Sequence, residues 1–231
     1  MIEFSDFEKS ASISFKDKSL LKQAFIHRSY INENPRTGLS HNERLEFLGD
    51  AVLELVVTDF LYRRYPNYTE GELTAIRSAL VNAVTISDVA TKIGMNEYLL
   101  LSKGEAKDTG KARQYILANT YEAFVGAAYL DQGYEVAGRF VANTLLPATE
   151  EIVHKKLWRD AKSLVQEKAQ EIVGVTPAYR VLRESGPDHD KHFTVGILFG
   201  SEMVAEGQGK SKQEAEQKAA EAAILARGWL E

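Results

Sequence analysis

The sequence contains no cysteine and only five prolines among its 231 residues. Without cysteine, disulfide bonds, zinc–thiolate sites and cysteine nucleophiles are all excluded. No apolar run approaches the roughly 20 residues that a bilayer-spanning helix needs, and the acidic N-terminus lacks the basic and then apolar plan of a signal peptide. We therefore expect a soluble, cytoplasmic protein without a membrane partner.

The chain also lacks an excess of positive charge. It carries 28 Lys and Arg against 33 Asp and Glu, which gives a formal net charge of −5. Domains that bind nucleic acid are often basic, so the average charge argues against a nucleic-acid ligand. Affinity for phosphates depends on a local basic face, however, and acidic metal sites lower the total. The positions of the charges are therefore more informative than their sum.

The apolar spacing up to about residue 153 is almost entirely helical. Apolar residues make up 44% and charged residues 26% of the chain, a globular balance. We expect helices over 18–30, 42–65, 69–93 with a break before residue 93, 115–130, and 135–153 with an interruption at Pro147. The polar, basic segment 102–114 is expected to be a loop.

The pattern changes at a short polar segment, 154–158, which we interpret as a hinge between domains 1–153 and 159–231. A helix is expected over 160–173, followed by strands over 178–184, 193–199 and 202–206 and an alanine-rich helix over 211–226. In the middle strand Phe193, Val195, Ile197 and Phe199 alternate with smaller or polar residues, which indicates one buried face. The fold class is thus an all-α N-terminal domain followed by a small α+β domain of order α-β-β-β-α.

Three acids share one face of the expected helix 42–65. Glu43, Glu46 and Asp50 fall at i, i+3 and i+7, and at about 100° per residue they lie within roughly 60° of one another around the helix. Like charges at this spacing repel. Because the neighbouring side chains are mostly apolar, the acids are either a solvated strip or a site that holds a cation, and the residues leave both interpretations open.

A second expected helix offers Asn119 and Glu122, again at i and i+3, and Glu70 is a third source of oxygen. All these donors are oxygen atoms, which favours Mg²⁺, or Mn²⁺ as a substitute, over zinc. Carboxylate-bound Mg²⁺ suits phosphoryl chemistry. The pattern calls for no organic cofactor. Residue chemistry alone leads to an acidic metal site at which phosphate chemistry is feasible.

The segment 42–51, NERLEFLGDA, resembles the signature of the ribonuclease III family. Three further segments agree in order and spacing: AFIHRSY at 24–30, YTEGEL at 68–73 and EAFVGA at 122–127. Residues 159–228 resemble the double-stranded RNA-binding domain that follows the nuclease domain in bacterial members. The resemblance covers essentially the whole chain, and it implies a homodimeric endoribonuclease that processes structured RNAs such as ribosomal RNA precursors.

The resemblance also implies roles for single residues. Glu46, Asn119 and Glu122 match the family's metal ligands, and Asp50 and Glu122 match its catalytic acids. The implied reaction is hydrolysis of RNA phosphodiesters by a metal-activated water, which leaves 5′-phosphate and 3′-hydroxyl ends. The family pattern usually has aspartate where this chain has Asn119, so the site lacks one negative charge and we expect weaker metal binding.

Other matched positions lie around this site. Glu43 and Glu70 match acids that line the same valley. Phe47 matches an aromatic residue that the family places at the dimer interface, although a phenylalanine in an apolar helix is also an ordinary core residue.

A basic group marks the start of the last expected helix. Ser211 is a natural N-cap, and Lys210 and Lys212 flank it where the helix N-terminus already favours phosphate. Lys218 adds a charge further along the helix. The loop 103–113 is basic too, and either a phosphate contact or plain solvation would account for it.

Two further segments match RNA-contacting positions of the family. Gln166 and Glu167 on the first helix of the second domain match residues that reach the minor groove, and His189 matches the loop that enters the next one. Contact with two successive minor grooves recognises the shape of A-form duplex rather than its sequence.

Two other functions compete with an RNA-cleaving enzyme. A non-cleaving double-stranded RNA-binding protein of the same fold would be consistent with Asn119, but the retained acids argue against it. A metal-dependent hydrolase of a small phosphate ester would have no use for the C-terminal domain.

Overall fold

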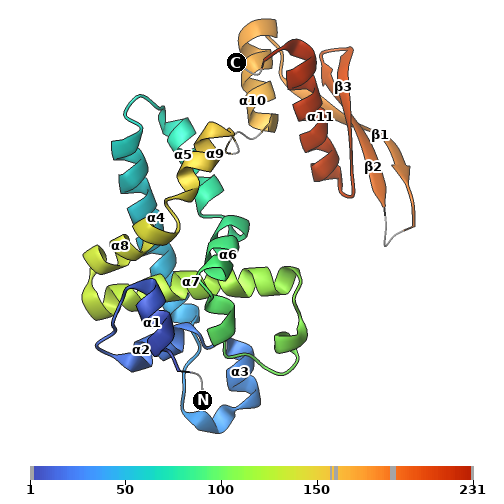
Figure 1. Cartoon of the computed structure of the whole chain (residues 1–231). Helices are drawn as coiled ribbons and strands as arrows, with labels where there is room; N and C mark the ends of the chain where they lie inside the picture. Colours follow the sequence, from blue (N-terminus) through green and yellow to red (C-terminus); the bar gives the residue numbers. More distant parts are fainter. Residues whose placement is uncertain (1–2, 157, 159–160, 188–190, 230–231) are drawn as a thin grey trace. The chain divides into compact units, whose positions relative to one another are not determined.

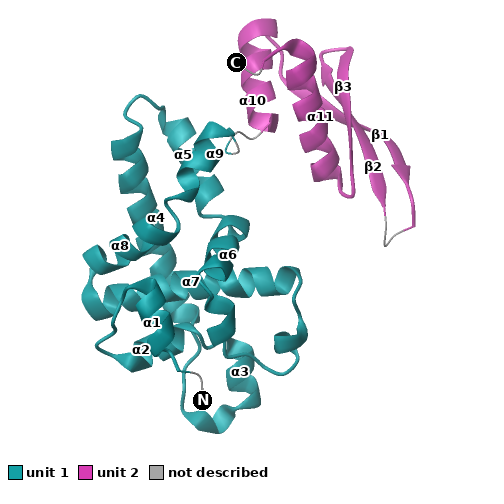
Figure 2. Cartoon of the chain, in the orientation of Figure 1, with its two compact units in different colours: residues 1–158 teal, residues 159–231 magenta. Residues whose placement is uncertain are grey.

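The structure is a computed structural model that describes residues 3–156, 158, 161–187 and 191–229. The chain divides into two compact units, Met1–Trp158 and Arg159–Glu231 (Figure 2). The first unit is helical and the second has a three-stranded sheet, so the predicted fold class is confirmed. Within the described residues no single helix is both long and apolar enough to cross a membrane. Only one bent pair of helices, Glu70–Leu80 with Ala83–Lys92, passes that test together.

The first unit is built around two long helices, α4 (Glu43–Arg64) and α7 (Lys111–Gln132), which pack against each other along the middle of the unit (Figure 1). Around them lie α1 (Ser5–Ala11), α2 (Lys18–Ala24), α3 (Arg28–Glu33), α5 (Glu70–Leu80), α6 (Ala83–Lys92), α8 (Tyr134–Thr144) and α9 (Ala148–His154). Short 3₁₀ turns cover Pro35–Thr37, Met95–Tyr98 and Glu105–Lys107.

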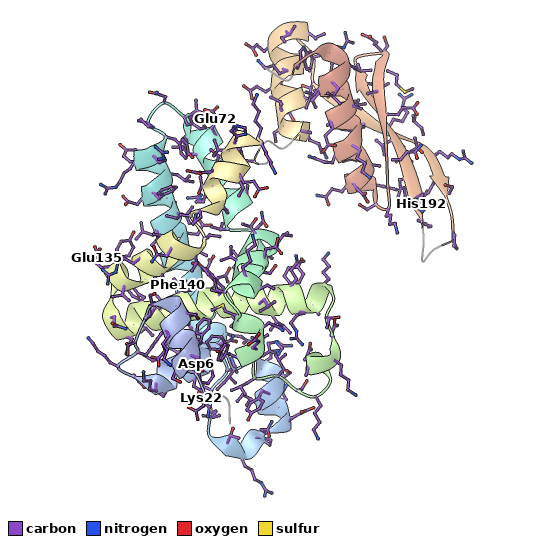
Figure 3. The ribbon with its side chains drawn as sticks, viewed as in Figure 1. Asp6, Lys22, Glu72, Glu135, Phe140 and His192 are labelled. Atoms are coloured by element: carbon purple, nitrogen blue, oxygen red, sulfur yellow. The ribbon has the colours of Figure 1, made fainter. Side chains whose placement is uncertain are left out.

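Aromatic rings fill the core of this unit. Phe7 meets Phe25 and Phe124 edge to face, with ring centroids 5.0 and 5.3 Å apart. Phe124 also packs on Phe140 at 4.6 Å, in the interior of the unit (Figure 3). These four rings are almost completely buried and come from four separate elements, so they join the N-terminal segment to α7 and α8.

Several helices begin at a residue whose side chain caps them. Thr69 and Glu72 form a reciprocal capping box at the start of α5, where Glu72 lies on the outer turn (Figure 3). Pro147 separates α8 from α9, as predicted. The break predicted within 69–93 falls at Val81 and Asn82, directly after Leu80, where the Asn82 side chain caps a new helix by accepting from Thr85 N–H at 3.0 Å.

Two expectations for this unit were wrong. The segment 18–30 is not one helix, because Ile26 forms a parallel bridge with Leu100 and the backbone between α2 and α3 is extended there. The expected loop 102–114 is shorter, because α7 already begins at Lys111.

The second unit places two helices on one face of an antiparallel sheet (Figure 1). The helices are α10 (Ala161–Lys168), which continues as a π-helical turn over Ala169–Val173, and α11 (Lys212–Arg227). The strands are β1 (Pro177–Ser185), β2 (His192–Phe199) and β3 (Glu202–Gly209), in the order β1-β2-β3. The alanine-rich helix α11 lies close on the sheet: a Cβ at Gly207 would come within 2.2 Å of the Ala219 backbone nitrogen.

The middle strand differs from the expectation of one buried face. All residues from Val195 to Phe199 are buried. The outward-facing Gly196 is covered by Met203 and Leu182, whose side chains would lie 3.0 and 3.1 Å from an added Cβ. Long side chains on the two edge strands therefore shield the outer face of the centre strand.

Candidate active site at the crossing of α4 and α7

Two glycines allow the backbones of α4 and α7 to touch. A Cβ added at Gly49 would lie 1.7 Å from the carbonyl oxygen of Glu122, and one added at Gly126 would lie 2.2 Å from the carbonyl oxygen of Leu45. No side chain of any size fits at either position. Glycine inside a helix costs roughly 0.5–1 kcal/mol relative to alanine, so its presence here is explained by the close crossing rather than by helix propensity.

The close crossing brings polar side chains of the two helices together. The side chain of Asn119 on α7 lies close enough to the Glu46 carboxylate on α4 to lower the pKa of that carboxyl group. Glu46, Asn119 and Glu122 are partly buried, whereas Asp50 is exposed at the edge of the group. The i, i+3 spacings on both helices therefore converge, and we refer to Glu46, Asp50, Asn119 and Glu122 as the acidic cluster.

The burial of the cluster and the closeness of its acids raise the pKa values of Glu122 and Glu46. Burial, followed by repulsion from Asp50, Glu46 and Glu54, raises the pKa of Glu122 to about 8. Burial and repulsion from Glu43 and Asp50 also raise the pKa of Glu46, while the Asn119 side chain acts in the opposite direction. Ionising the carboxyl groups of Glu46 and Glu122 together at this crossing therefore costs free energy.

Among the residues that the structure describes, the salt bridges of the acid row Glu43, Glu46, Asp50 and Glu54 on α4 lie at its two ends. At one end Glu43 faces Arg28 at 3.6 Å and His41 at 3.7 Å. At the other end Arg77 of α5 pairs with Glu54 at 2.9 Å. Among the ion pairs of the described residues, none involves Glu46, Asp50 or Glu122.

The donor set fits a hard divalent cation. It consists of carboxylate oxygens and one amide oxygen, the ligands that Mg²⁺ and Mn²⁺ prefer, and no salt bridge within the described part of the chain neutralises Glu46, Asp50 or Glu122. Within the described ranges no three Asp, Glu or His side chains already stand as a metal-binding group. The amide oxygen of Asn119 is a further oxygen donor at this crossing, beside the carboxyl groups of Glu46 and Glu122.

Glu70 does not lie with the acidic cluster in the single chain. It begins α5 and lines a hollow of about 460 Å³ between α4 and α5, together with Tyr62, Tyr68 and Arg77. Glu70 is not among the charges that shift the pKa of Glu46 or Glu122. Phe47 is 83% exposed, so the interpretation as an ordinary core residue is wrong for the single chain.

Three residues of the site were missed by the reasoning from sequence. Gly49 and Gly126 lie inside the matched segments, and a glycine within an apolar helix was the available signal. Glu54 continues the acid row four residues after Asp50, so the helical spacing could have included it.

The basic loop before α7 has a structural function. Arg113 donates to the Asn96 side chain and to the Glu105 carbonyl oxygen, both at 2.8 Å, and so joins α7 to the preceding turn. Arg113 is therefore occupied within the unit, while Lys103, Lys107 and Lys111 are exposed.

The second unit presents the predicted basic group at the start of α11. The Ser211 hydroxyl caps the helix by accepting from Glu214 N–H at 3.1 Å. The Glu214 carboxylate accepts from Lys210 N–H and from the Lys218 ammonium, both at 2.8 Å. The Lys212 ammonium lies 5.6 Å from the Phe193 ring centroid.

Two more predicted RNA contacts, Gln166 and Glu167, are exposed on α10. His189 lies outside the described residues.

Comparisons with known proteins agree with this architecture. A ribonuclease-III-like family model matches residues 17–149, and a double-stranded RNA binding motif matches residues 161–226. A curated ribonuclease 3 from Borreliella burgdorferi is 43% identical over 224 residues, which is 97% of this chain and 91% of the relative. A ribonuclease 3 from Pelotomaculum thermopropionicum is 43% identical over 213 residues, 92% of this chain and 88% of the relative.

The fold of the first unit is similar to that of a solved structure. The nuclease domain of ribonuclease III from Campylobacter jejuni, described with a region involved in dimer formation, matches with a TM-score of 0.57 at 35% identity. The match covers 63% of this chain and 97% of that one. The fold and the site thus define a two-domain nuclease with a double-stranded RNA-binding module. The chain belongs to the ribonuclease III family.

Proposed function

We propose that this protein is an endoribonuclease that hydrolyses phosphodiesters of double-stranded RNA with Mg²⁺, leaving 5′-phosphate and 3′-hydroxyl ends. The single observation that carries the proposal is the acidic cluster: two glycines force together acids that no protein cation neutralises among the described residues. The matched RNA-binding motif in the second unit supplies the substrate class. Structured precursors, including those of ribosomal RNA, are the expected substrates.

Glu46, Asn119 and Glu122 would hold the cation, with carboxylate and amide oxygens. When bound, Mg²⁺ lowers the pKa of a coordinated water and neutralises charge on the leaving oxygen. Glu122, whose pKa is about 8 without an ion, holds a proton at neutral pH that cation binding displaces. Asp50 is exposed at the edge of the cluster, where it can accept a proton from the attacking water.

The RNA-binding surface of the second unit is proposed to include Gln166, Glu167 and His189, together with a basic group at α11. The basic group consists of Lys210, Ser211, Lys212 and Lys218. Because Glu214 already pairs with Lys218, part of this positive charge is neutralised, which favours modest affinity for phosphates.

The test is incubation of the purified protein with a labelled RNA duplex, with and without Mg²⁺. The proposal expects cleavage of the duplex only with the ion, no cleavage of single-stranded RNA of the same sequence, and 5′-phosphate at the new ends. A duplex that is bound but never cut would instead identify a non-cleaving RNA-binding protein. Turnover of a small phosphodiester without competition from duplex RNA would identify a small-ester hydrolase.

A homodimer is proposed from the exposed face of α4. Phe47, Leu55 and Tyr62 lie at i, i+8 and i+15 on one side of the helix and are 83%, 57% and 73% exposed. The hollow that contains Glu70 adjoins this face at Thr58 and Tyr62. A two-fold dimer would bury the apolar face, as the dimer-forming region of the Campylobacter jejuni relative suggests, and could bring Glu70 of the partner subunit towards the acidic cluster.

Replacing Phe47 with alanine should weaken this dimer. An aromatic anchor at the centre of an interface commonly contributes about 2 kcal/mol or more, which corresponds to roughly a 30-fold rise in the dissociation constant. Sedimentation equilibrium measures the change, and Tyr115→Ala on another exposed position is the control. An unmodified protein that sediments as a monomer would contradict the dimer.

Replacing Asn119 with aspartate should lower the Mg²⁺ concentration needed for half-maximal cleavage. The two side chains have nearly the same shape, so the change mainly adds a negative charge beside Glu46 and Glu122. Without metal, the same charge replaces a neutral amide that favours the ionised Glu46 by a carboxylate that repels it, and the ion-free protein should melt at a lower temperature. Asn119→Ala removes the oxygen and should raise the Mg²⁺ requirement; coinciding midpoints for all three proteins would mean that Asn119 is not a ligand.

A further inference from the structure

The acid row of α4 does not end at Asp50. Glu54 lies four residues further on, so it occupies the same helix face one turn away. It is half-buried on α4, five residues after Gly49, where the backbone of α4 touches that of α7 at Glu122. Glu54 is therefore close enough to act on the acidic cluster electrostatically, without being one of the residues matched to the family's metal ligands.

Arg77 holds Glu54 with a well-defined geometry. Its Nε lies 2.9 Å from Oε2 of Glu54, and its Nη1 donates to Oγ1 of Thr58 at 3.0 Å. Glu54 and Thr58 are successive residues on one face of α4, so the guanidinium from α5 is fixed at two points. The side chains of Arg77 and Glu54 are only 34% and 37% exposed, which limits screening by solvent.

The Arg77–Glu54 pair has no net charge, and this neutrality affects how strongly the acidic cluster attracts a divalent cation. Without Arg77, Glu54 would be a free carboxylate beside Asp50 and Glu122 and would attract a divalent cation towards this end of the row. With Arg77 but without Glu54, an unpaired guanidinium would repel the cation.

We propose that Arg77 and Glu54 form the boundary of the cation site: Arg77 is a positioning residue that withdraws Glu54 from the acid row, so that a divalent cation is held at Glu46, Asn119 and Glu122. This inference rests on the proposed function, because it requires a cation at the cluster. According to this inference, Arg77 and Glu54 change the affinity for the metal through their charges, and not only through the stability of the fold.

The experiment measures binding of Mn²⁺ to the ion-free, full-length protein by electron paramagnetic resonance at low ionic strength. Arg77→Met should tighten binding by about threefold to tenfold, because it leaves a net negative charge near the site. Glu54→Gln should weaken binding by a similar factor, because it leaves a net positive charge. The double variant should return to within about twofold of the unmodified protein, and Arg77→Lys, which keeps the charge, should change little.

The inference is supported if Arg77→Met and Glu54→Gln change the Mn²⁺ affinity in opposite directions and the double variant cancels the two changes. A purely structural role would weaken binding in both single variants, and that result would overturn it. A double variant as weak as Glu54→Gln would also overturn it, because Glu54 would then be a ligand itself. If Arg77→Met does not fold, as judged by circular dichroism, the Mn²⁺ affinity of Glu54→Gln is compared with those of the double variant and Arg77→Lys, and this comparison decides whether the boundary exists.

The proposed function is tested separately in the same titration. Glu122→Gln should remove the Mn²⁺ site. If the unmodified protein binds no Mn²⁺ that depends on Glu122, the proposed function fails. If binding depends on Glu122 but does not respond to Arg77 and Glu54 as described, only the boundary fails.

Discussion

Glu122→Gln is expected to abolish RNA cleavage and at the same time to stabilise the ion-free protein at alkaline pH. Glutamine keeps the shape of the side chain but removes the ionisable group at the centre of the acidic cluster. Loss of a metal-binding carboxylate that also handles a proton should reduce the rate by on the order of 1000-fold or more. Asp50→Asn should reduce it in the same way, while binding of duplex RNA stays nearly intact in both variants.

The stability effect follows from the raised pKa. Below pH 4.5, the ordinary value of the carboxyl group, Glu122 is neutral in the folded and in the unfolded protein and costs nothing. As the pH rises from there to about 8, the unfolded chain releases the proton and the folded protein retains it, so the free energy of unfolding falls. Because one pKa unit corresponds to about 1.4 kcal/mol, the total penalty amounts to a few kcal/mol.

Chemical denaturation of the ion-free proteins at pH 4 and at pH 9 measures this effect. The glutamine variant should be the more stable protein at pH 9 and nearly equal to the unmodified one at pH 4, and Mg²⁺ should stabilise only the unmodified protein. Glu135→Gln, at an exposed position on α8, is the control and should change neither cleavage nor the pH dependence. Near-normal cleavage by Glu122→Gln would rule out the mechanism, whereas equal stability at pH 9 would rule out only the electrostatic account of the cluster.

Much of the fold could be predicted from sequence because the signals are local. Thr69 and Glu72 form a capping box, Ser211 caps the last helix, and Pro147 separates two helices, each through contacts within a few residues. The acid spacing on α4 is also local, since i, i+3 and i+7 lie on one face of any α-helix.

The failures depend on contacts between distant segments. The helix predicted over 18–30 is broken because Ile26 pairs with Leu100, a backbone contact that helical periodicity does not encode. The fully buried centre strand depends on Leu182 and Met203 from its two neighbours. Arg77 was not distinguished by its own segment, because its salt bridge with Glu54 joins two helices.

The same limit applies to the acidic cluster. The sequence showed which residues share a face of each helix, but it did not show that the faces of α4 and α7 meet. That information lies in Gly49 and Gly126, whose missing side chains are required only by the partner helix. The effect of Asn119 on Glu46 is another consequence of this crossing: the amide lowers the pKa of the Glu46 carboxyl group, whereas an aspartate there would repel it.

Gly49→Ala is therefore expected to have the largest structural effect of any single methyl group in the first unit. The added Cβ would overlap the carbonyl oxygen of Glu122 at 1.7 Å, and this atom is backbone, so no rotamer change can relieve the clash. The helices α4 and α7 would have to move apart along their contact, around which the hydrophobic core of the first unit is packed. We expect a loss of about 3 kcal/mol or more in the free energy of unfolding, at or above the upper range for overpacking, and loss of cleavage.

Gly71→Ala is the matched control, because Gly71 lies in helix α5 and an added Cβ would meet nothing within 4 Å. That variant should be neutral or more stable by up to about 1 kcal/mol, as alanine is the better helix former. Urea unfolding of the ion-free proteins and a Mg²⁺ titration of cleavage measure the two effects. If Gly49→Ala were as stable and as active as Gly71→Ala, the helices would not be in backbone contact, and the acidic cluster would have to be assembled in another way. If it folds but needs far more Mg²⁺, the separation between Glu46 on one helix and Asn119 and Glu122 on the other is what the two glycines control.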